Sequence, residues 1–413
     1  MEPFFTNDAV VLGILLLVLA AVFATAHSSH AFWRGFYKVV PALLLCYLIP
    51  ALLNWPLGLI SGSKSNLYFI ASRYLLPASL VLLCLSVDFR GILNLGPKAL
   101  VVFLAGSLGV VLGGPIALLV VVNFMPGLIP VSPDELWRGL STIAGSWIGG
   151  SANQTAMKEI FKVDDNLFGT MVIIDVVVAY VWMGVLLYGA SITGRVDRWL
   201  KADTSAIEAL KERVTAFRLQ VERIPGTRDT ITLLAVTFGA VGLSHWAADV
   251  ISPWLQAKQM ISLRWLEDSY FWIIVVATTL GLGLSFTRFR KLEGVGASRY
   301  GTVFIYLMVA TIGMKMNLKE VFDHMGLFVV GIIWMLIHIL ALLVVAKLVR
   351  APFFYVAVGS QANIGGAASA PVVASAFSPA LAPVGVLLAV LGYALGTYGG
   401  ILCAWMMQMA VGG

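Results

Sequence analysis

Two short stretches of small and polar residues interrupt segments that are otherwise apolar enough to lie in a bilayer. The first, 149–156, reads GGSANQTA, and the second, 359–371, reads GSQANIGGAASAP. Both contain an Ala-Asn pair, ending at Asn153 in the first and at Asn363 in the second. Interrupted apolar segments at corresponding places in two halves of a chain indicate the binding site of a secondary transporter.

Glycines in both stretches, with Pro371 in the second, predict that the helices are broken there. A lipid-exposed backbone must satisfy every N–H and C=O group internally, so a helix breaks only where protein or a water-filled cavity receives the freed groups. An unwound chain at Gly366 would need a positive φ, which a β-branched residue resists. The residues expected to set the backbone geometry of the two breaks are Gly149, Gly150, Gly365, Gly366 and Pro371.

Neutral oxygens and amides at the breaks suit a cation together with an anionic solute. Hard cations such as Na⁺ are held by such oxygens and by carbonyls at half-helix C-termini, whereas half-helix N-termini favour anionic groups. The candidates for solute binding are Ser151, Gln154, Thr155, Ser360, Gln361 and Ser369. The alternative for each residue alone is that it only satisfies broken backbone.

Asp175 lies several residues inside the apolar segment MVIIDVVVAY. An ionised carboxylate near a helix centre costs about 2.5 to 3.5 kcal/mol on insertion scales, so an intramembrane acid is a functional hypothesis by default. We predict a Na⁺ site at Asp175, Asn153 and Asn363, with H⁺ as the alternative coupling ion and no other cofactor. A buried acid that only holds unwound backbone is the structural alternative.

Two cations near predicted span ends, Arg73 and Lys315, are further candidates. Each could pair with a carboxylate of the solute. The alternative is that each extends along its alkyl stem to the membrane interface.

The composition predicts a polytopic membrane protein of the all-α class. The 413 residues are 60% hydrophobic and 12% charged, whereas about 25% of residues are charged in a soluble domain. The net charge of +6 comes from loops, as the positive-inside bias expects, so membrane lipid and a small solute are the expected partners and nucleic acid is not. Walker, HExxH and nucleophile-elbow motifs are absent from the sequence, which argues against an enzyme.

Apolar windows predict roughly twelve transmembrane spans. The matched breaks predict two inverted repeats, each with a broken helix: 1–194 and 230–413, joined by a charged cytoplasmic linker at 195–229. Loop charges make the two broken spans antiparallel, whereas six crossings between them would make them parallel. Either one predicted element is re-entrant, interfacial or wrongly divided, or the charges of the linker do not report its side of the membrane; the inversion is favoured, because opposed broken helices are a common transporter plan.

The linker itself has the pattern of an amphipathic helix. Ser205 and Glu208 form a capping-box pattern, and apolar residues then recur every three or four positions until Pro225. Such a helix lies on the membrane surface or on its own subunit, or it forms a homodimer contact.

The chain resembles the DUF819 family of bacterial membrane proteins over nearly its whole length. The matching stretches are LLPASLVLLCLSVDFRGILNLGPK, WIGGSAN, the IID that contains Asp175, LIHILALLVVAKLVRAP, SQANIGGAASAP and LGYALGTYGG. The resemblance implies a multi-pass protein of the bacterial cytoplasmic membrane. More distantly, paired broken helices beside an intramembrane Asp are similar to the sodium/proton antiporter and bile-acid symporter folds, which move a core domain against a scaffold.

These observations favour a secondary active transporter that imports a small anionic or zwitterionic organic solute with Na⁺ by alternating access. A cation/proton antiporter without an organic substrate is the first alternative. A membrane sensor or scaffold that signals through the linker helix is the second.

Overall fold

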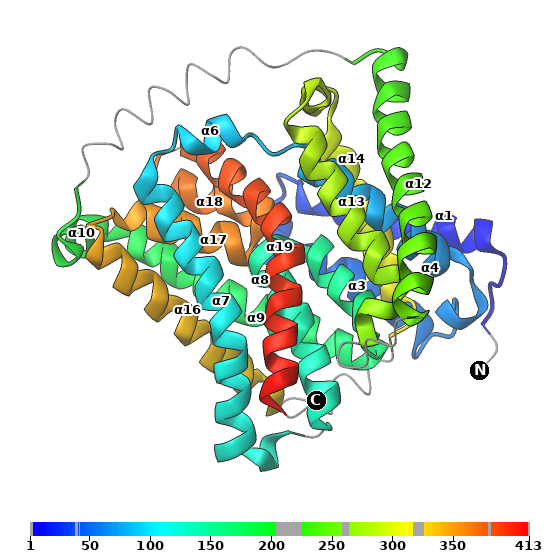
Figure 1. Ribbon diagram of the computed structural model, residues 1–413, viewed down its shortest axis with the longest axis horizontal. Helices are drawn as coiled ribbons and strands as arrows, with labels where there is room; N and C mark the ends of the chain where they lie inside the picture. The colour runs from blue at the N-terminus through cyan, green and yellow to red at the C-terminus, as the bar shows by residue number, and fades with distance from the viewer. Residues whose placement is uncertain are drawn as a thin grey trace.

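Figure 1 shows the computed structural model, which describes residues 3–37, 40, 42–129, 131–203, 225–257, 264–316, 326–378 and 381–411. Regular structure in these ranges is helical throughout. The predicted linker helix falls at 204–224, outside the described residues.

The helices of the first half are α1 (Asp8–Ala26), α2 (Ala31–Phe36), α3 (Ala42–Asn54), η1 (Gly62–Lys64), α4 (Leu67–Ile70), the π-helical η2 (Ala71–Leu75), α5 (Leu76–Leu85), α6 (Phe89–Leu93), α7 (Pro97–Phe124), η3 (Pro126–Leu128), α8 (Pro133–Ile160), α9 (Asp165–Ser191) and α10 (Thr193–Leu200). Those of the second half are α12 (Thr227–Ala257), η4 (Arg264–Glu267), α13 (Ser269–Ser285), η5 (Arg288–Val295), α14 (Ala297–Gly313), α16 (Phe328–Leu348), α17 (Phe353–Ile364), α18 (Gly366–Phe377) and α19 (Ala382–Ala410).

The long helices form two groups that cut across the two halves of the sequence (Figure 1). One group, here the hairpin bundle, contains α7, α8, α9, α16, α17, α18 and α19. The other, the flanking bundle, contains α1, α3, α4, η2, α5, α12, α13 and α14. Each half of the chain therefore contributes first to the flanking bundle and then to the hairpin bundle. The predicted repeats 1–194 and 230–413 stay a prediction.

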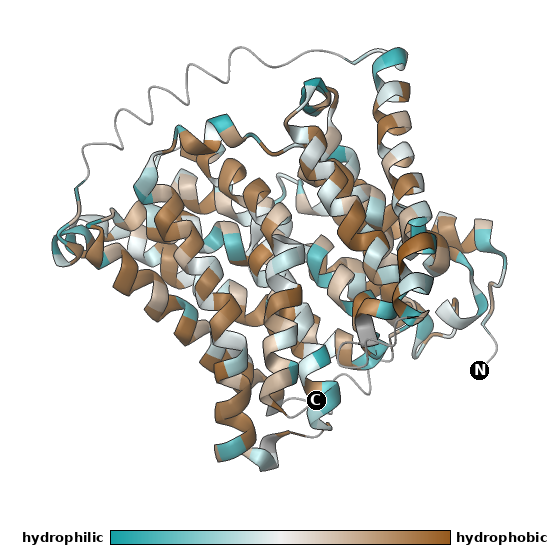
Figure 2. Ribbon diagram, in the orientation of Figure 1, coloured by the Kyte–Doolittle hydropathy of each residue, from teal (hydrophilic) through white to brown (hydrophobic). Residues whose placement is uncertain are grey.

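Seven described helical segments are long and apolar enough to cross a membrane, or eight if the bent pair α13 and η5 forms one span. The prediction of about twelve spans is not confirmed. Apolar residues cover most of these long helices, whereas hydrophilic residues gather near helix ends and in loops (Figure 2). The chain is therefore a membrane protein with several transmembrane helices.

α8 is bent back on itself into a helical hairpin, here the first hairpin. Its start is fixed by a capping box between Ser132 and Glu135. Arg138 Nη1 then donates to the carbonyl of Phe161 at 3.0 Å, although a straight helix would separate these positions by about 35 Å. A methyl group on Gly145 would also lie 2.6 Å from the carbonyl oxygen of Asn153. The two arms of α8 therefore pack together, and both ends lie on the same side of the molecule.

α17 and α18 form a second hairpin of the same kind. The rings of Phe354 and Phe377, at its two ends, have centroids 5.3 Å apart. Nearer the break, Gln361 Nε2 donates to Ser369 Oγ at 2.7 Å, across eight positions of sequence. The predicted broken spans are therefore hairpins whose ends meet, which is the geometry of a re-entrant element.

The open ends of the two hairpins lie at opposite ends of α9. The first hairpin leads into α9 at Asp165 through a turn of four residues, 161–164. The second begins beside α10, which follows the other end of α9, because the Phe353 amide donates to Asp197 Oδ1 at 2.7 Å. α9 has 27 residues and is about 40 Å long. We call the end near α10, from which the linker leaves, the linker side.

Candidate functional site

The tip of each hairpin contains a glycine with a positive φ. Gly150 has φ +73° and ψ −173°, and Gly366 has φ +61°. An L-residue with a side chain rarely adopts such angles, so glycine is required where the chain reverses. Gly149 and Gly365 precede these residues at the two tips. Pro371, in contrast, lies within α18 and not at the break.

The two tips meet on α19. A methyl group on Gly392 would lie 2.7 Å from the carbonyl oxygen of Ile148, just before the first tip, and 3.4 Å from that of Ala362, three residues before Gly365 at the second. The adjacent Tyr393 has its ring 3.3 Å from the position of a methyl group on Gly150, and its phenol lies beside the backbone of Ala367. One segment of α19 therefore contacts both breaks.

Asn153 ties the tip of the first hairpin to α19. Its Nδ2 donates to the carbonyls of Gly149 at 2.9 Å and Tyr393 at 3.1 Å, while its Oδ1 accepts from Thr397 Oγ1 at 2.5 Å. The backbones approach closely here, because a methyl group on Gly396 would lie 2.5 Å from Cα of Gly149. Both polar atoms of this fully buried side chain are thus used to fix the tip.

Asn363 has the same set of partners on α7. Its Nδ2 donates to the carbonyls of Gly359 at 3.0 Å and Phe103 at 3.1 Å, and its Oδ1 accepts from Ser107 Oγ at 2.7 Å. Each Asn therefore binds the carbonyl four residues before it, together with a carbonyl and a hydroxyl one turn apart on a neighbouring helix. The two residues are not at equivalent positions, since Asn153 follows its tip and Asn363 precedes its own.

Asp175 holds the two arms of the first hairpin together. Its Oδ2 accepts from Ser146 Oγ at 2.6 Å and Gln154 Nε2 at 3.0 Å, and its Oδ1 accepts from Trp147 Nε1 at 2.6 Å. Ser146 and Trp147 precede the tip, whereas Gln154 follows it. The residue is 6% exposed, and the ion pairs in the described ranges do not include it.

The three residues of the predicted cation site do not hydrogen-bond with one another in the described part of the chain. Asp175 binds within the first hairpin, Asn153 binds α19, and Asn363 binds α7. A group of three His, Cys, Asp or Glu residues that could hold a metal ion is absent from the same ranges. The cation site at Asp175, Asn153 and Asn363 stays a prediction.

The candidates for solute binding fall into two sets. The first set is held by protein partners. Gln154 donates to Asp175, Thr155 donates to the Ser151 carbonyl, and Ser360 Oγ hydrogen-bonds with Trp182 and His338. Ser151, Gln361 and Ser369 lie beside the tips. Gln361 Oε1 is buried and has no hydrogen-bond partner among the described residues, and a methyl group on the buried Gly366 would meet no atom within 4 Å. The second tip therefore offers an unused acceptor and open space.

Sequence reasoning did not single out the residues that hold the tips from neighbouring helices. These are Ser107 on α7 and Tyr393 and Thr397 on α19. It also missed Ser146 and Trp147, which lie on the first hairpin itself and donate to Asp175. One signal was available in LGYALGTYGG, where glycines recur every four residues at 392, 396 and 400. That spacing makes one face of α19 small enough for a hairpin to approach.

Comparison with known proteins gives two findings. A family model described as "Protein of unknown function (DUF819)" matches residues 13–410, which include both hairpins. The uncharacterized membrane protein YjcL of Bacillus subtilis (strain 168) is 24% identical to this chain over 341 residues, covering 82% of this chain and 83% of YjcL. The similarity therefore extends across both bundles.

Proposed function

This chain belongs to the DUF819 family, whose description assigns no activity, and we propose that it is a secondary active transporter. The observation that carries the proposal is the meeting of two hairpin tips on α19, between hairpins that enter from opposite ends of α9. Irregular backbone at membrane depth is tolerated where it lines a cavity or is buried in protein, and transporters place their sites there.

The solute site in this proposal lies at the two tips. Ser151, Gln361 and Ser369 would contact the solute, with the Tyr393 ring beside them, while Gln154, Thr155 and Ser360 hold the tips in place. The N-terminus of α18, at Gly366, favours an anionic group. The unpartnered Gln361 Oε1 favours a hydrogen-bond donor. A small anionic or zwitterionic organic solute satisfies both requirements.

Asp175 is the proposed site of cation coupling. A buried carboxylate with three neutral donors and no cationic side chain would be neutralised by a bound Na⁺ or by a proton. We favour Na⁺ symport, with Asn153 and Asn363 keeping backbone carbonyls of the tips oriented around the ion path. The antiporter without organic solute remains the second candidate, because this isolated carboxylate would also suit exchange of H⁺ for Na⁺.

The topology that we propose has ten crossings and two re-entrant hairpins. Up to eight segments meet the length criterion, and α3 and α14 would be the ninth and tenth. Each half then contributes five crossings and one hairpin, and five crossings invert the second half relative to the first. This arrangement satisfies the charge bias that makes the breaks antiparallel. The protein would lie in the bacterial cytoplasmic membrane, and a homodimer contact through the linker stays a prediction.

Cysteine labelling tests this topology. The native Cys46, Cys84 and Cys403 are buried, so introduced single cysteines report alone. We expect a cysteine at Lys201 or Arg288 to be protected from an impermeant maleimide in intact cells and labelled after lysis, because both loops should be cytoplasmic. A cysteine at Ser63 should be labelled in intact cells. Labelling of the first two from outside would contradict the proposed orientation.

Uptake by proteoliposomes tests the function. We expect accumulation of one member of a panel of carboxylates, amino acids and short peptides under an inward Na⁺ gradient, and none without a gradient. Accumulation under an H⁺ gradient alone would replace Na⁺ by H⁺ as the coupling ion. Na⁺-driven proton release without solute would favour the antiporter. Absence of any gradient-dependent flux would contradict transport.

A further inference from the structure

Ion pairs connect the hairpin bundle with the flanking bundle on the side opposite the linker. The first hairpin has its open end there, next to the start of α4, the start of α13 and the end of α14. In the described ranges, the ion pairs that join the two bundles are Lys315 with Asp165 and Lys162 with Asp268. Both lie on this side. On the linker side, Arg290 of η5 pairs with Asp88 at the N-cap of α6, a helix that belongs to neither bundle as defined here.

The first connection is a partly buried network of four charges. Lys158 Nζ lies 2.8 Å from Asp165 Oδ1 and 3.4 Å from Glu159 Oε1, all within the hairpin bundle. From the flanking bundle, Lys315 Nζ lies 2.7 Å from Asp165 Oδ2. Tyr68, also of the flanking bundle, has its hydroxyl against Glu159 and 2.8 Å from Lys158 Nζ. Asp165 is therefore shared between a lysine of its own bundle and a lysine of the other.

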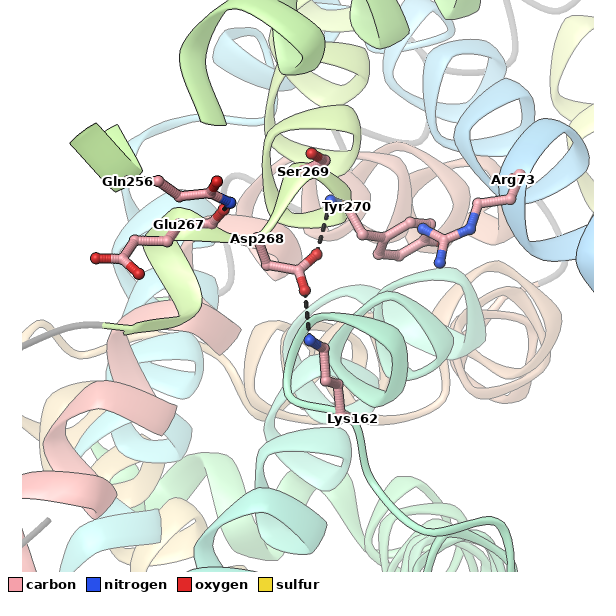
Figure 3. Close-up of a pocket in the computed structure, with 7 residues that line it drawn as sticks. All are labelled: Arg73, Lys162, Gln256, Glu267, Asp268, Ser269 and Tyr270. Carbon is pink, nitrogen blue, oxygen red and sulfur yellow. Dashed lines mark hydrogen bonds and ion pairs between the residues drawn. The ribbon is translucent and has the colours of Figure 1, made fainter. Parts of the chain in front are cut away.

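The second connection crosses the edge of a pocket. Lys162 Nζ, just after the first hairpin, lies 2.6 Å from Asp268 Oδ2 at the start of α13 (Figure 3). The pocket has a volume of about 480 Å³. Its other lining residues all come from the flanking bundle and the loop before α13, and Arg73 stacks on Tyr270 with its guanidinium carbon 4.2 Å from the ring centroid. The Lys162–Asp268 ion pair, which joins the two bundles, therefore lies at the edge of an open pocket.

Two further polar contacts that join the bundles in the described ranges are neutral. Thr278 and Thr279 of α13 lie within 3.2 and 2.7 Å of Thr397 and Tyr398 of α19. Such hydroxyl pairs can be exchanged for others at small cost when helices slide. Separating a partly buried pair such as Lys315–Asp165 costs more, because a charge that stays buried without its partner is uncompensated. Separation of the two bundles on this side would break both ion pairs.

We propose that Lys315–Asp165 and Lys162–Asp268 form a charge latch that holds the side opposite the linker closed. The latch opens when the hairpin bundle moves relative to the flanking bundle, and Lys158 then keeps Asp165 paired. This inference rests on the proposed function, since a latch needs two states to separate. It assigns Lys315 a role in conformational change and not in binding a solute carboxylate.

The arrangement of charges indicates which variant to use. Removing Lys158, which is 5% exposed in its side chain, would leave two carboxylates poorly paired and could unfold the protein. The double variant Lys315→Gln/Lys162→Gln removes only the charges that join the bundles, and these side chains are 26% and 71% exposed. Lys98→Gln is the matched control, because its 2.9 Å ion pair with Asp203 is 31% exposed on the lysine and does not involve the flanking bundle.

Distance measurements between spin labels test the latch without requiring a known solute. Spin labels on Ser63→Cys, in η1 just before α4 of the flanking bundle, and on Phe124→Cys, at the end of α7 of the hairpin bundle, report two exposed positions on the latched side. In the double lysine variant we expect a longer distance to gain about tenfold in population relative to the original one. Lys98→Gln should keep the original distribution.

Two results would overturn the latch. One is an unchanged distance distribution in the double variant with unchanged uptake. The other is an unchanged distribution with lost uptake, which would make the lysines solute contacts. The proposed function is judged separately, by gradient-driven uptake in the unmodified protein. If the unmodified protein shows no gradient-driven uptake, the distances between the spin labels can still be measured. Failure of the proposed function can therefore be distinguished from failure of the latch.

Discussion

Replacement of Asp175 by asparagine is expected to abolish gradient-driven accumulation of the solute, lowering the initial rate by about 100-fold or more. Asparagine removes the negative charge that would hold a coupling cation and cannot exchange a proton near neutral pH. Counterflow exchange of solute, which needs no net driving force, should survive. The measurement is uptake with and without the cation gradient, alongside exchange in preloaded vesicles.

The hydrogen bonds of Asp175 make a purely structural effect a real alternative. Ser146, Trp147 and Gln154 all donate to the carboxylate, so an asparagine NH₂ group would face at least one donor. Leaving a buried polar group unpaired costs about 1 to 3 kcal/mol. Thermal unfolding of the variant therefore has to be measured with transport. The exposed Asp249 on α12 provides the matched control, and Asp249→Asn should leave both uptake and stability unchanged.

Three outcomes separate the alternatives for Asp175. Full cation-driven uptake by Asp175→Asn would reduce this residue to a structural acid. Loss of both uptake and exchange, together with a lowered unfolding temperature, would also assign it to holding the hairpin. Loss of accumulation with exchange retained is the result that coupling requires.

Sequence patterns predicted the places of both breaks but not the form that they take. An apolar stretch of about 25 residues has the same composition whether its helix crosses the bilayer or folds back halfway. The contacts that distinguish these cases, such as Arg138 with Phe161, join positions about 35 Å apart along a straight helix. The conflict between loop charge and span count was nevertheless a usable signal, because a re-entrant element does not change sides.

The matching Ala-Asn pairs illustrate a different limit. Aligning Asn153 with Asn363 places Gly149 opposite Gly359, whereas the second chain reversal occurs at Gly366. The similar residues therefore reflect a similar set of hydrogen bonds from each Asn to a neighbouring helix, and not equivalent positions in the two hairpins. The hydrogen-bond partners of the two Asn side chains, on α19 and α7, are far away in the sequence, so no local sequence pattern indicates them.

The partners in the ion pairs could not be predicted from the sequence either. Lys315 was a candidate for the interface or for a solute carboxylate, and it pairs with Asp165 instead. Its partner lies 150 positions earlier, in a turn that only the hairpin brings to the end of α14. Residue type predicted a cation near a span end, but its partner depended on the packing of the two bundles.

Replacement of Gly366 by valine is expected to abolish transport while the protein still inserts into the membrane. Gly366 has φ +61°, and a methyl group there would meet no atom within 4 Å. The cost of a side chain is therefore conformational and not steric: roughly 1 to 2 kcal/mol for alanine in the left-handed region, and more for a β-branched residue. Since the second tip is where Gln361 Oε1 is left unpartnered, a backbone that abandons this angle moves the proposed solute site.

A second glycine that has open space around it but a helical backbone serves as the control for the effect of the backbone angle. Gly184, in α9, also has no atom within 4 Å of an added methyl group, and its φ is not positive. Gly184→Val should therefore retain most of the uptake, whereas Gly366→Ala should reduce it by about tenfold and Gly366→Val should remove it. Equal uptake by Gly184→Val and Gly366→Val, with equal amounts in the membrane, would mean that the chain reversal at the second tip is not needed for transport. A graded loss from alanine to valine at Gly366 alone would tie transport to one backbone angle, because the control adds the same side chain in equally open space at a glycine whose φ is not positive.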